Sequence, residues 1–588
     1  MAERKLLVVS VIASMLVWRA SAAHDTFPVK SKNLNLAPPV DVYISPDVSP
    51  FSIFDVHPVH GCLASDGAYM LTGKALESDG GTNKKAFAVK INEVTGNIMW
   101  VWGSSATGVD DAANAILQLP GTNVLGTGGD LIVAGYRVVN GVAQRSLTKL
   151  DLATGAETWT ATWPGSGGAG AWEMIELTKD GQHVLLAGLT GAANSQEFNF
   201  KSCESKLCWA WFERYRPCRH AALRFAHLTH TSPPVPLLYP SCGTDGNVVS
   251  GTAVVAKLPV SALTSATAPT QAAVTWEKQF APFLTSKAAR GLPDGSVVAL
   301  LYAEASSKQA SLVLLDGDGA VSWGPNDYGS QHGEGTDIVV AYDGGSFAIS
   351  GQGPGGVEGS LSGRLTKVSI DGNYLGSASY SSVDYAAGGS SKLIKNECWG
   401  LQALKDGYIV GCGTGIEDCI GYTGQKLTDC NSGLGDKSTG AVARPPSVWQ
   451  SLIIRTDLDG GLLWQRVDQY REEGQPALGE PGWKAQSSAS EYVLVLPGGG
   501  FVSVNDEVNG IGLLRLGAES GGTMVLGNSA SKKDDSGAII GGVIGGVVAV
   551  VLCVLAFFAY RKWQMSKKIP ATTTATDSKF DSVSGDRA

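Results

Sequence analysis

Apolar and polar residues alternate in short stretches along most of the chain, and glycine-containing turns separate these stretches. In residues 86–102, apolar side chains occupy every second position on both sides of a turn at Gly96. A period of two is typical of β-strands with one buried face, and glycine adopts the positive φ that such a turn needs. This stretch therefore predicts an amphipathic β-hairpin.

The same hairpin recurs along the chain. Residues 149–159 repeat residues 90–100 at the same spacing, and weaker copies, one of them without Trp at 367–376, follow. The residues that recur in the four clearest copies are Asn92, Gly96, Trp100, Asp151, Gly155, Trp159, Asp316, Gly319, Trp323, Asp457, Gly460 and Trp464. We expect the large residue after each turn to pack between neighbouring repeats.

A second motif, a turn Gly followed by an apolar strand, precedes these hairpins. It occurs at 66–73, 128–135, 180–188, 294–300, 343–351, 406–413 and 497–504. These units, with about four strands in each, predict an all-β fold, a single β-propeller of about seven four-stranded blades without helices. One blade cannot bury both of its faces, whereas a closed ring can. The last unit stops near Leu516, so we expect a segment between Val40 and Val56 to complete it and close the ring.

Two of the repeats resemble a known family. The segments Lys90–Trp100 and Lys149–Trp159 resemble the pyrroloquinoline-quinone (PQQ) type repeat of quinoprotein-like propellers, in which an apolar strand is followed by Asp, Thr-Gly and Trp. The resemblance weakens in the other repeats. It implies the propeller fold rather than an activity.

Both ends of the chain predict export and membrane anchoring. Residues 1–22 combine a charged start, an apolar run and a small-residue cleavage site, as a signal peptide does. Residues 537–560 contain no charge and precede Arg561 and Lys562, which predicts a transmembrane helix followed by a cytoplasmic tail at 561–588. The remaining expected parts are a linker at 23–39, the propeller at 40–520 and a juxtamembrane linker at 521–536.

The predicted span also contains paired small residues. Gly541 with Gly545, and Gly542 with Gly546, would let a second helix approach closely, although Gly is common in such helices anyway. The topology places the propeller outside the cell or in an endomembrane lumen. The net charge of -9 and the lack of a basic run argue against a nucleic-acid partner.

The chain has ten cysteines, and an exported protein favours disulfides. Cys398, Cys412, Cys419 and Cys430 lie around a Gly-rich insert, where we expect Cys398 to pair with Cys412 and Cys419 with Cys430; a zinc site is the alternative. A second insert at 203–242 lacks the Gly-turn rhythm on either side of it. It represents either retained intron sequence or a basic surface loop.

Three functions fit this organisation. The first is non-catalytic recognition of a protein or glycan by propeller loops, with no cofactor. The second is a PQQ- and Ca²⁺-dependent dehydrogenase, for which no ligand can be assigned in the sequence. The third is a glycosidase, because residues 457–464 approximate a sialidase Asp-box and Asp468, Glu472 and Glu473 follow. His57, His60 and Cys62 could bind a metal, although a loop before the first blade also explains them.

Overall fold

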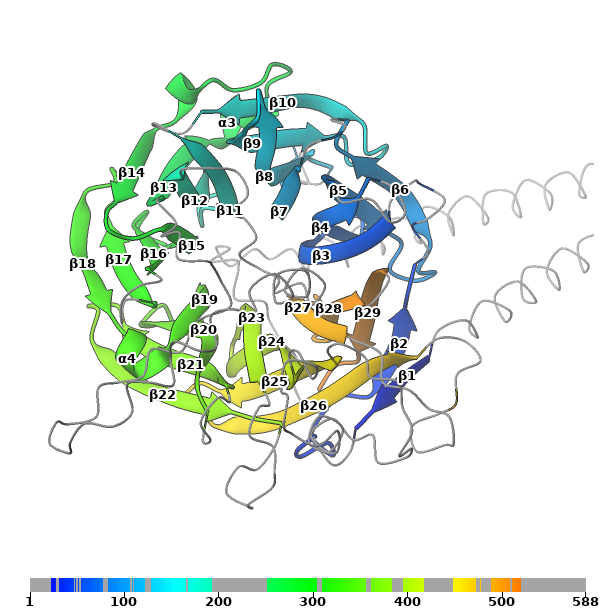
Figure 1. Ribbon diagram of the computed structural model, residues 1–588. Coiled ribbons are helices and arrows are strands. Elements are labelled where there is room, and N and C mark those ends of the chain that lie inside the picture. Colours follow the sequence, from blue (N-terminus) through cyan, green and yellow to red (C-terminus); the bar gives the residue numbers. More distant parts are fainter. Residues whose placement is uncertain are drawn as a thin grey trace, which may run out of the picture. The chain divides into compact units, whose positions relative to one another are not determined.

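The computed structural model describes residues 23–519 with gaps, the longest of them at 193–250, 383–394, 417–447 and 477–487. The described residues form seven antiparallel sheets. Figure 1 shows these sheets around a common centre, in chain order. The predicted all-β propeller of seven blades is therefore confirmed.

Each blade contributes one strand to each of four positions, counted outwards from the centre (Figure 1). The innermost strands are β3 (Phe54–Leu63), β7 (Ala112–Gln118), β11 (Ala169–Leu177), β15 (Thr285–Gly291), β19 (Glu334–Val340), β23 (Lys395–Leu404) and β27 (Ser488–Val495). The second strands are β4 (Tyr69–Leu76), β8 (Leu131–Val139), β12 (His183–Ala192), β16 (Val297–Tyr302), β20 (Ser346–Pro354), β24 (Gly407–Ile416) and β28 (Phe501–Glu507).

The outer half of each blade is a hairpin of a third and a fourth strand. The third strands are β5 (Lys84–Ile91), β9 (Val142–Leu150), β13 (Thr252–Pro259), β17 (Ser311–Leu315), β21 (Leu361–Ser369), β25 (Val448–Asp457) and β29 (Gly510–Leu516). The fourth strands are β6 (Ile98–Gly103), β10 (Glu157–Trp163), β14 (Trp276–Phe280), β18 (Val321–Asp327), β22 (Tyr374–Tyr380), β26 (Leu462–Arg471) and β2 (Val40–Ile44).

The ring closes through the N-terminal strand β2. This strand pairs with β29, with Val40 opposite Leu516 and Ile44 opposite Leu513. The seventh blade is thus completed from the predicted segment, although only Val40–Ile44 takes part and Phe54 already begins the first blade. Closure joins segments more than 460 residues apart, so the propeller has no unpaired end between its first and last blades.

Residues 23–27 and 31–39, expected to lie in a linker, instead belong to the propeller. Strand β1 (Ala23–Thr26) pairs with β26 and makes the sixth blade five-stranded, and Lys32 forms a further bridge to Gln465. The ring of Phe27 is buried in the hydrophobic core of this part of the propeller. A strand of four residues is too short to show an alternating pattern, which is why the sequence did not predict it.

Among the described residues, helices occur only in connections between strands. The described residues include α3 (Val260–Thr264), the 3₁₀ helix η5 (Gln271–Ala273) and α4 (Gly329–His332). The expectation of a propeller without helices was therefore wrong in detail. All three are short and leave the sheets uninterrupted.

The strand order gives the propeller two different faces. Connections from first to second strands and from third to fourth strands end on one face, which we call the turn face. Connections from second to third strands and from blade to blade end on the opposite face, which we call the loop face. Both unusual inserts join a second to a third strand, β12 to β13 and β24 to β25, and therefore depart from the loop face.

No helix among the described residues is long and apolar enough to cross a membrane. The predicted signal peptide, juxtamembrane linker, span at 537–560 and tail lie outside the described residues, as do the four glycines of the span. The insert at 203–242, Cys419 and Cys430 lie outside them as well.

Candidate functional site

Tryptophans on the fourth strands join five of the blades to the next one. Trp100 Nε1 donates a hydrogen bond of 3.1 Å to the carbonyl of Leu152, in the outer turn of the second blade. Trp159 Nε1 donates a hydrogen bond of 3.1 Å to the carbonyl of Ser265, in the third blade. Trp323 and Trp464 donate to the Ile370 carbonyl and to Glu519 Oε1, and Trp276, which the sequence analysis missed, donates to Gly317. A long connection at 260–275 precedes Trp276 in place of the short Gly turn, so the sequence pattern did not reveal this tryptophan.

A lysine on the third strand shares the acceptor with this tryptophan. Lys90 Nζ lies 3.0 Å from the same Leu152 carbonyl and 2.5 Å from Asp66, in the first turn of its own blade. Lys149 repeats the arrangement with Ser265 and Asp130. The Asp-containing turn and the outer hairpin, which recur as separate motifs in the sequence, thus meet through an ion pair.

The turn residues hold the shape of this joint. Asp151 Oδ1 accepts hydrogen bonds from the backbone N–H groups of Ala153 and Thr154, and Asn92 acts in the same way in the first blade. Gly155 has a φ of 70°, and a Cβ there would lie 2.5 Å from Trp100 Cε3. The recurring Asp, Gly and Trp residues therefore serve blade packing.

Every innermost strand carries a β-bulge at the same level. The seven residues without a partner on the second strand are Val59, Asn114, Glu173, Lys287, Thr336, Trp399 and Glu491, which we call the bulge ring. A bulge bends the strand and redirects a side chain. The bulge ring is thus the one level at which all seven blades present an irregular residue near the propeller centre.

The bulges explain the Gly that ends the second motif in several blades. A Cβ on Gly188 would lie 2.1 Å from the carbonyl oxygen of Ala171, two residues before the bulge at Glu173. Gly73, Gly135 and Gly351 are crowded by a carbonyl in the equivalent way. Real Cβ atoms do not approach oxygen so closely, so these four positions require glycine. Leu301, Cys412 and Asn505 occupy the equivalent position in the other three blades.

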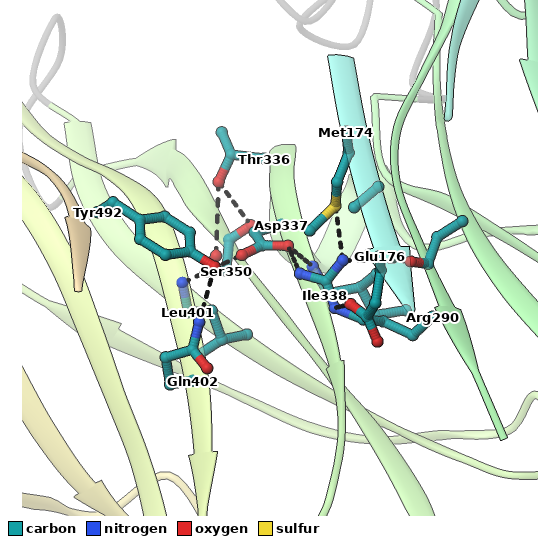
Figure 2. A network of polar contacts seen from close by, with 12 residues as sticks. Met174, Glu176, Arg290, Thr336, Asp337, Ile338, Ser350, Leu401, Gln402 and Tyr492 are labelled. Carbon is teal, nitrogen blue, oxygen red and sulfur yellow. Dashed lines mark hydrogen bonds and ion pairs between the residues drawn. The ribbon is translucent and has the colours of Figure 1, made fainter. Parts of the chain in front are cut away.

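A polar network links the innermost strands beside this ring, as Figure 2 shows. Arg290 of β15 contacts Asp337 of β19 at 2.7 Å and Glu176 of β11 at 2.8 Å. Asp337 also accepts hydrogen bonds from the backbone N–H groups of Ile338 and Leu401, the latter on β23. The network therefore connects four consecutive blades.

Burial and charge together set the ionisation of this network. Burial lowers the pKa of Arg290, but Asp337 and Glu176 oppose it, and the pKa is raised overall. Burial raises the pKa of Glu176, and Arg290 offsets only part of the rise. Burial also raises the pKa of Tyr492, whose hydroxyl accepts a hydrogen bond from Gln402. Arg290 thus stays a cation shared by carboxylates, an arrangement that fastens blades together.

The residues considered for a metal site have other partners. His57 Nδ1 lies 3.0 Å from Asp506 Oδ2, and His60 accepts a hydrogen bond from the Ile116 N–H while its ring packs against Tyr492. Burial raises the pKa of the Cys62 thiol to about 12. Among the described residues, no three His, Cys, Asp or Glu side chains come together as a metal site would need.

The two enzymatic alternatives gain no site in the described residues. A PQQ–Ca²⁺ centre needs carboxylate and amide oxygens converging beside the quinone. At the propeller centre, Asn114 Nδ2 and Thr336 Oγ1 donate hydrogen bonds to the carbonyls of Trp172 and Cys398 on neighbouring blades. The glycosidase candidate Asp468 is buried and paired with Arg466. Glu472 and Glu473 lie outside the described residues.

The sixth blade carries a cross-strand disulfide at the base of its insert. The predicted bond between Cys398 and Cys412 is present, joining β23 to β24. The half-buried rings of Trp399 and Trp449 lie next to it, with their centroids 6.0 Å apart. A Cβ on Gly413 would lie 2.8 Å from an atom of each ring. This part of the loop face combines a covalent constraint with accessible aromatic rings.

The carboxyl group of Glu507 lies at the ring closure. It is buried within the seventh blade, where its Oε1 accepts hydrogen bonds from Tyr43 Oη of β2 at 2.7 Å and from Ser488 Oγ at 2.9 Å. Burial raises the pKa of Glu507 to about 8. A group titrating near neutral pH thus contacts the strand that closes the propeller.

These features define the chain as a seven-bladed β-propeller, and its function is argued from its own residues. No protein-family model matches the chain. No curated protein matches it either.

Several solved structures are similar to the chain at low identity. Hydrazine synthase from Kuenenia stuttgartiensis is 12% identical, with 78% of this chain and 95% of that chain covered and a TM-score of 0.38. Sqt1 from Chaetomium thermophilum, bound to the N-terminus of ribosomal protein L10, is 12% identical, with 82% and 100% covered and a TM-score of 0.37. Quinohemoprotein alcohol dehydrogenase from Comamonas testosteroni is 10% identical, with 82% and 69% covered and a TM-score of 0.33.

Proposed function

We propose that this chain is a membrane-anchored recognition protein whose propeller binds a protein or glycan partner through the loop face, without catalysing a reaction. The observation that carries the proposal is the unequal use of the two faces. Both long inserts depart from the loop face, whereas the side chains of the turn face are engaged in holding blades together.

The turn face has little capacity left for a partner. Its Asp side chains cap their own turns or pair with a third-strand cation, as Asp66 does with Lys90 and Asp406 with Arg455. Loops on a rigid scaffold are where propellers and similar folds place binding residues. The half-buried pair Trp399 and Trp449 offers large aromatic surfaces on the loop face, and such rings dominate many recognition sites.

The anchoring part of the proposal comes from the sequence. Residues 537–560 are long and apolar enough to span a bilayer, and the basic residues after them favour a cytoplasmic tail. The propeller then faces the cell exterior or an endomembrane lumen, where disulfides such as Cys398–Cys412 persist.

Site-specific photocrosslinking in cells tests the proposal. A photoreactive amino acid replaces Val142 or Phe51 on the loop face, and Val94 or Tyr342 on the turn face; all four side chains are exposed. We expect one partner, identified by mass spectrometry, to crosslink from the loop-face positions only. Crosslinks of that partner from the turn-face positions instead would contradict the proposal, as would the absence of crosslinks from all four.

A further inference from the structure

Two tryptophans of the sixth blade differ from those that join the blades. Trp399 and Trp449 are half-buried, and their ring centroids lie 6.0 Å apart with the ring planes at 52°. A joint tryptophan such as Trp100 donates its Nε1 hydrogen bond to a carbonyl of the next blade. Trp399 Nε1 has no hydrogen-bond partner in the described part of the chain and is not buried, so it can donate to a group from outside.

The glycines of β24 make room for both rings. A Cβ on Gly413 would lie 2.8 Å from an atom of each ring, so the two rings cover this strand. Trp449 lies opposite Gly415, the next residue of β24 on the same face of the sheet. Cys398 and Cys412 belong to the core on the other face, which the fifth blade shares. The two rings thus form a surface that a disulfide supports from behind, and we call it the Trp platform.

Two charged side chains share the face of the Trp platform. Glu397 lies opposite Gly413 and Lys395 opposite Gly415, and directly opposed residues of an antiparallel pair have their side chains on the same face. Both side chains are half-buried. Their charges are of opposite sign, so together they favour neither an anion nor a cation. A purely apolar partner would remove both charges from water, which is unfavourable. The Trp platform therefore suits a ligand that is apolar on its broad face and polar at its rim.

We propose that the Trp platform, with Glu397 and Lys395, binds a β-1,4-linked oligosaccharide of glucose or N-acetylglucosamine. The equatorial substituents of these sugars leave axial C–H groups on the broad faces of each ring, and such faces pack against indole rings. The hydroxyl groups at the rim can donate to the Glu397 carboxylate and accept from Lys395 Nζ and Trp399 Nε1. The inference rests on the proposed function, because it names the class of partner that the loop face takes.

Isothermal titration calorimetry of the full chain tests the site. The protein is held in lipid nanodiscs, since many detergents carry sugar headgroups that would compete. The probes are cellotetraose and N-acetylated chitotetraose, and the reference is β-1,4-linked galactotetraose, whose axial hydroxyl interrupts one apolar face of each ring. We expect the wild type to bind at least one probe, one molecule per chain, about tenfold more tightly than galactotetraose.

Variants of the two tryptophans assign the binding to the Trp platform. Trp399→Ala and Trp449→Ala should each weaken binding by about tenfold or more, because a ring contact is lost. Trp399→Phe keeps a ring but removes the N–H donor, and should weaken binding by about two- to tenfold. The control is Tyr342→Ala, which removes an exposed ring on the turn face and should bind as the wild type does. Thermal unfolding shows which variants are folded, and Trp399→Phe keeps the test valid if an Ala variant is not.

Three results would overturn the proposal: no binding of either probe by the wild type, equal affinity for galactotetraose, or wild-type affinity in the folded tryptophan variants. The photocrosslinking experiment does not use the Trp platform. A partner captured from Val142 or Phe51 without oligosaccharide binding would leave the proposed function standing and remove only the glycan site. Binding of a probe without any crosslink would do the reverse.

Discussion

Individual residues decide how one blade meets the next. Trp100 and Lys90 share the carbonyl of Leu152 as their acceptor, and Gly155 in the same turn has no side chain that would displace the indole. The joint therefore depends on a small residue, a large apolar residue with one donor, and a cation. This combination explains why the outer hairpin recurs in the sequence with the same residue types.

Substitution of the turn glycine tests the joint. Gly155→Ala should cost about 1 kcal/mol for the positive φ and a further 1 to 3 kcal/mol for the contact with Trp100. Gly141→Ala is the control, since Gly141 also has a positive φ, of 77°, but open space around its Cα. Denaturant unfolding should show the larger loss for Gly155→Ala. Equal losses would mean that the Trp contact contributes nothing.

Glu507 makes the stability of the ring closure depend on pH. Its pKa in the folded protein is about 8, above the value of roughly 4.3 for an unfolded chain. A raised pKa means that its contribution to stability is complete below pH ~4 and is lost as the pH rises toward 8. We expect the free energy of unfolding to fall by about 3 kcal/mol between pH 5 and pH 8 through this group.

The variant Glu507→Gln isolates that contribution. Other groups, including His24, whose pKa is lowered by burial, titrate over part of the same range and remain in the variant. The pH slope of the unfolding free energy between pH 5 and pH 8 should therefore be smaller in Glu507→Gln than in the wild type. Identical slopes in the two proteins would show that the carboxyl of Glu507 titrates normally.

At the scale of strands, the innermost elements are joined by charge as well as by apolar packing. Arg290 on β15 contacts carboxylates on β11 and β19. Such a buried pair is weak evidence for net stability, but the removal of one partner leaves an uncompensated charge in the protein interior. The strands at the centre are therefore sensitive to single changes in this network.

Substitutions in the polar network around Arg290 should have non-additive effects on the free energy of unfolding. Arg290→Met should lower the free energy of unfolding by about 3 to 5 kcal/mol, and addition of Asp337→Asn should restore part of the loss. Lys367→Met is the control, because Lys367 pairs with Asp459, which is almost fully exposed, and should cost less than about 1 kcal/mol. A double variant that simply adds the two single losses would contradict a coupled network.

The attachment of the short N-terminal strand β1 to the sixth blade can be tested separately. Phe27 anchors β1 in the core of the sixth blade, and its removal should release β1 from the edge of β26. Phe27→Ala should raise the hydrogen-exchange rates of β26 amides and leave those of β9, on the opposite side of the ring (Figure 1), unchanged. Unchanged exchange in β26 would show that backbone pairing alone holds the strand.

The outer hairpins could be predicted because their signal is local. Asp151, Gly155 and Trp159 lie within nine residues, and the alternating pattern reports the buried face. The bulge ring could not, since a bulge adds one residue to a strand without a characteristic composition. The contact of Arg290 with Glu176 and Asp337 joins residues far apart in the chain, and no pattern in one sequence reports such a pairing. Only the Gly opposite four of the seven bulges, as at Gly188, left a trace that could have been recognised.

At the scale of the whole molecule, the strand order separates two tasks. The turn face carries the Trp, Lys and Gly residues that join consecutive blades, and the loop face carries both inserts and the aromatic pair of the sixth blade. Closure by β2 then ties the first blade to the last. A rigid ring with one variable face suits recognition, because the loops can change while the blade joints are kept.

The comparison of two insertions in one blade tests this division most directly. Six Gly and Ser residues are inserted either between Asn140 and Gly141 on the loop face or between Ala153 and Thr154 on the turn face, and the free energy of unfolding is measured for both. The loop-face insertion should cost about 1 kcal/mol or less, since it adds loop entropy alone. The turn-face insertion should cost about 3 kcal/mol or more, because it displaces the Leu152 carbonyl from Trp100 and Lys90. Equal costs, or a greater cost on the loop face, would contradict the account.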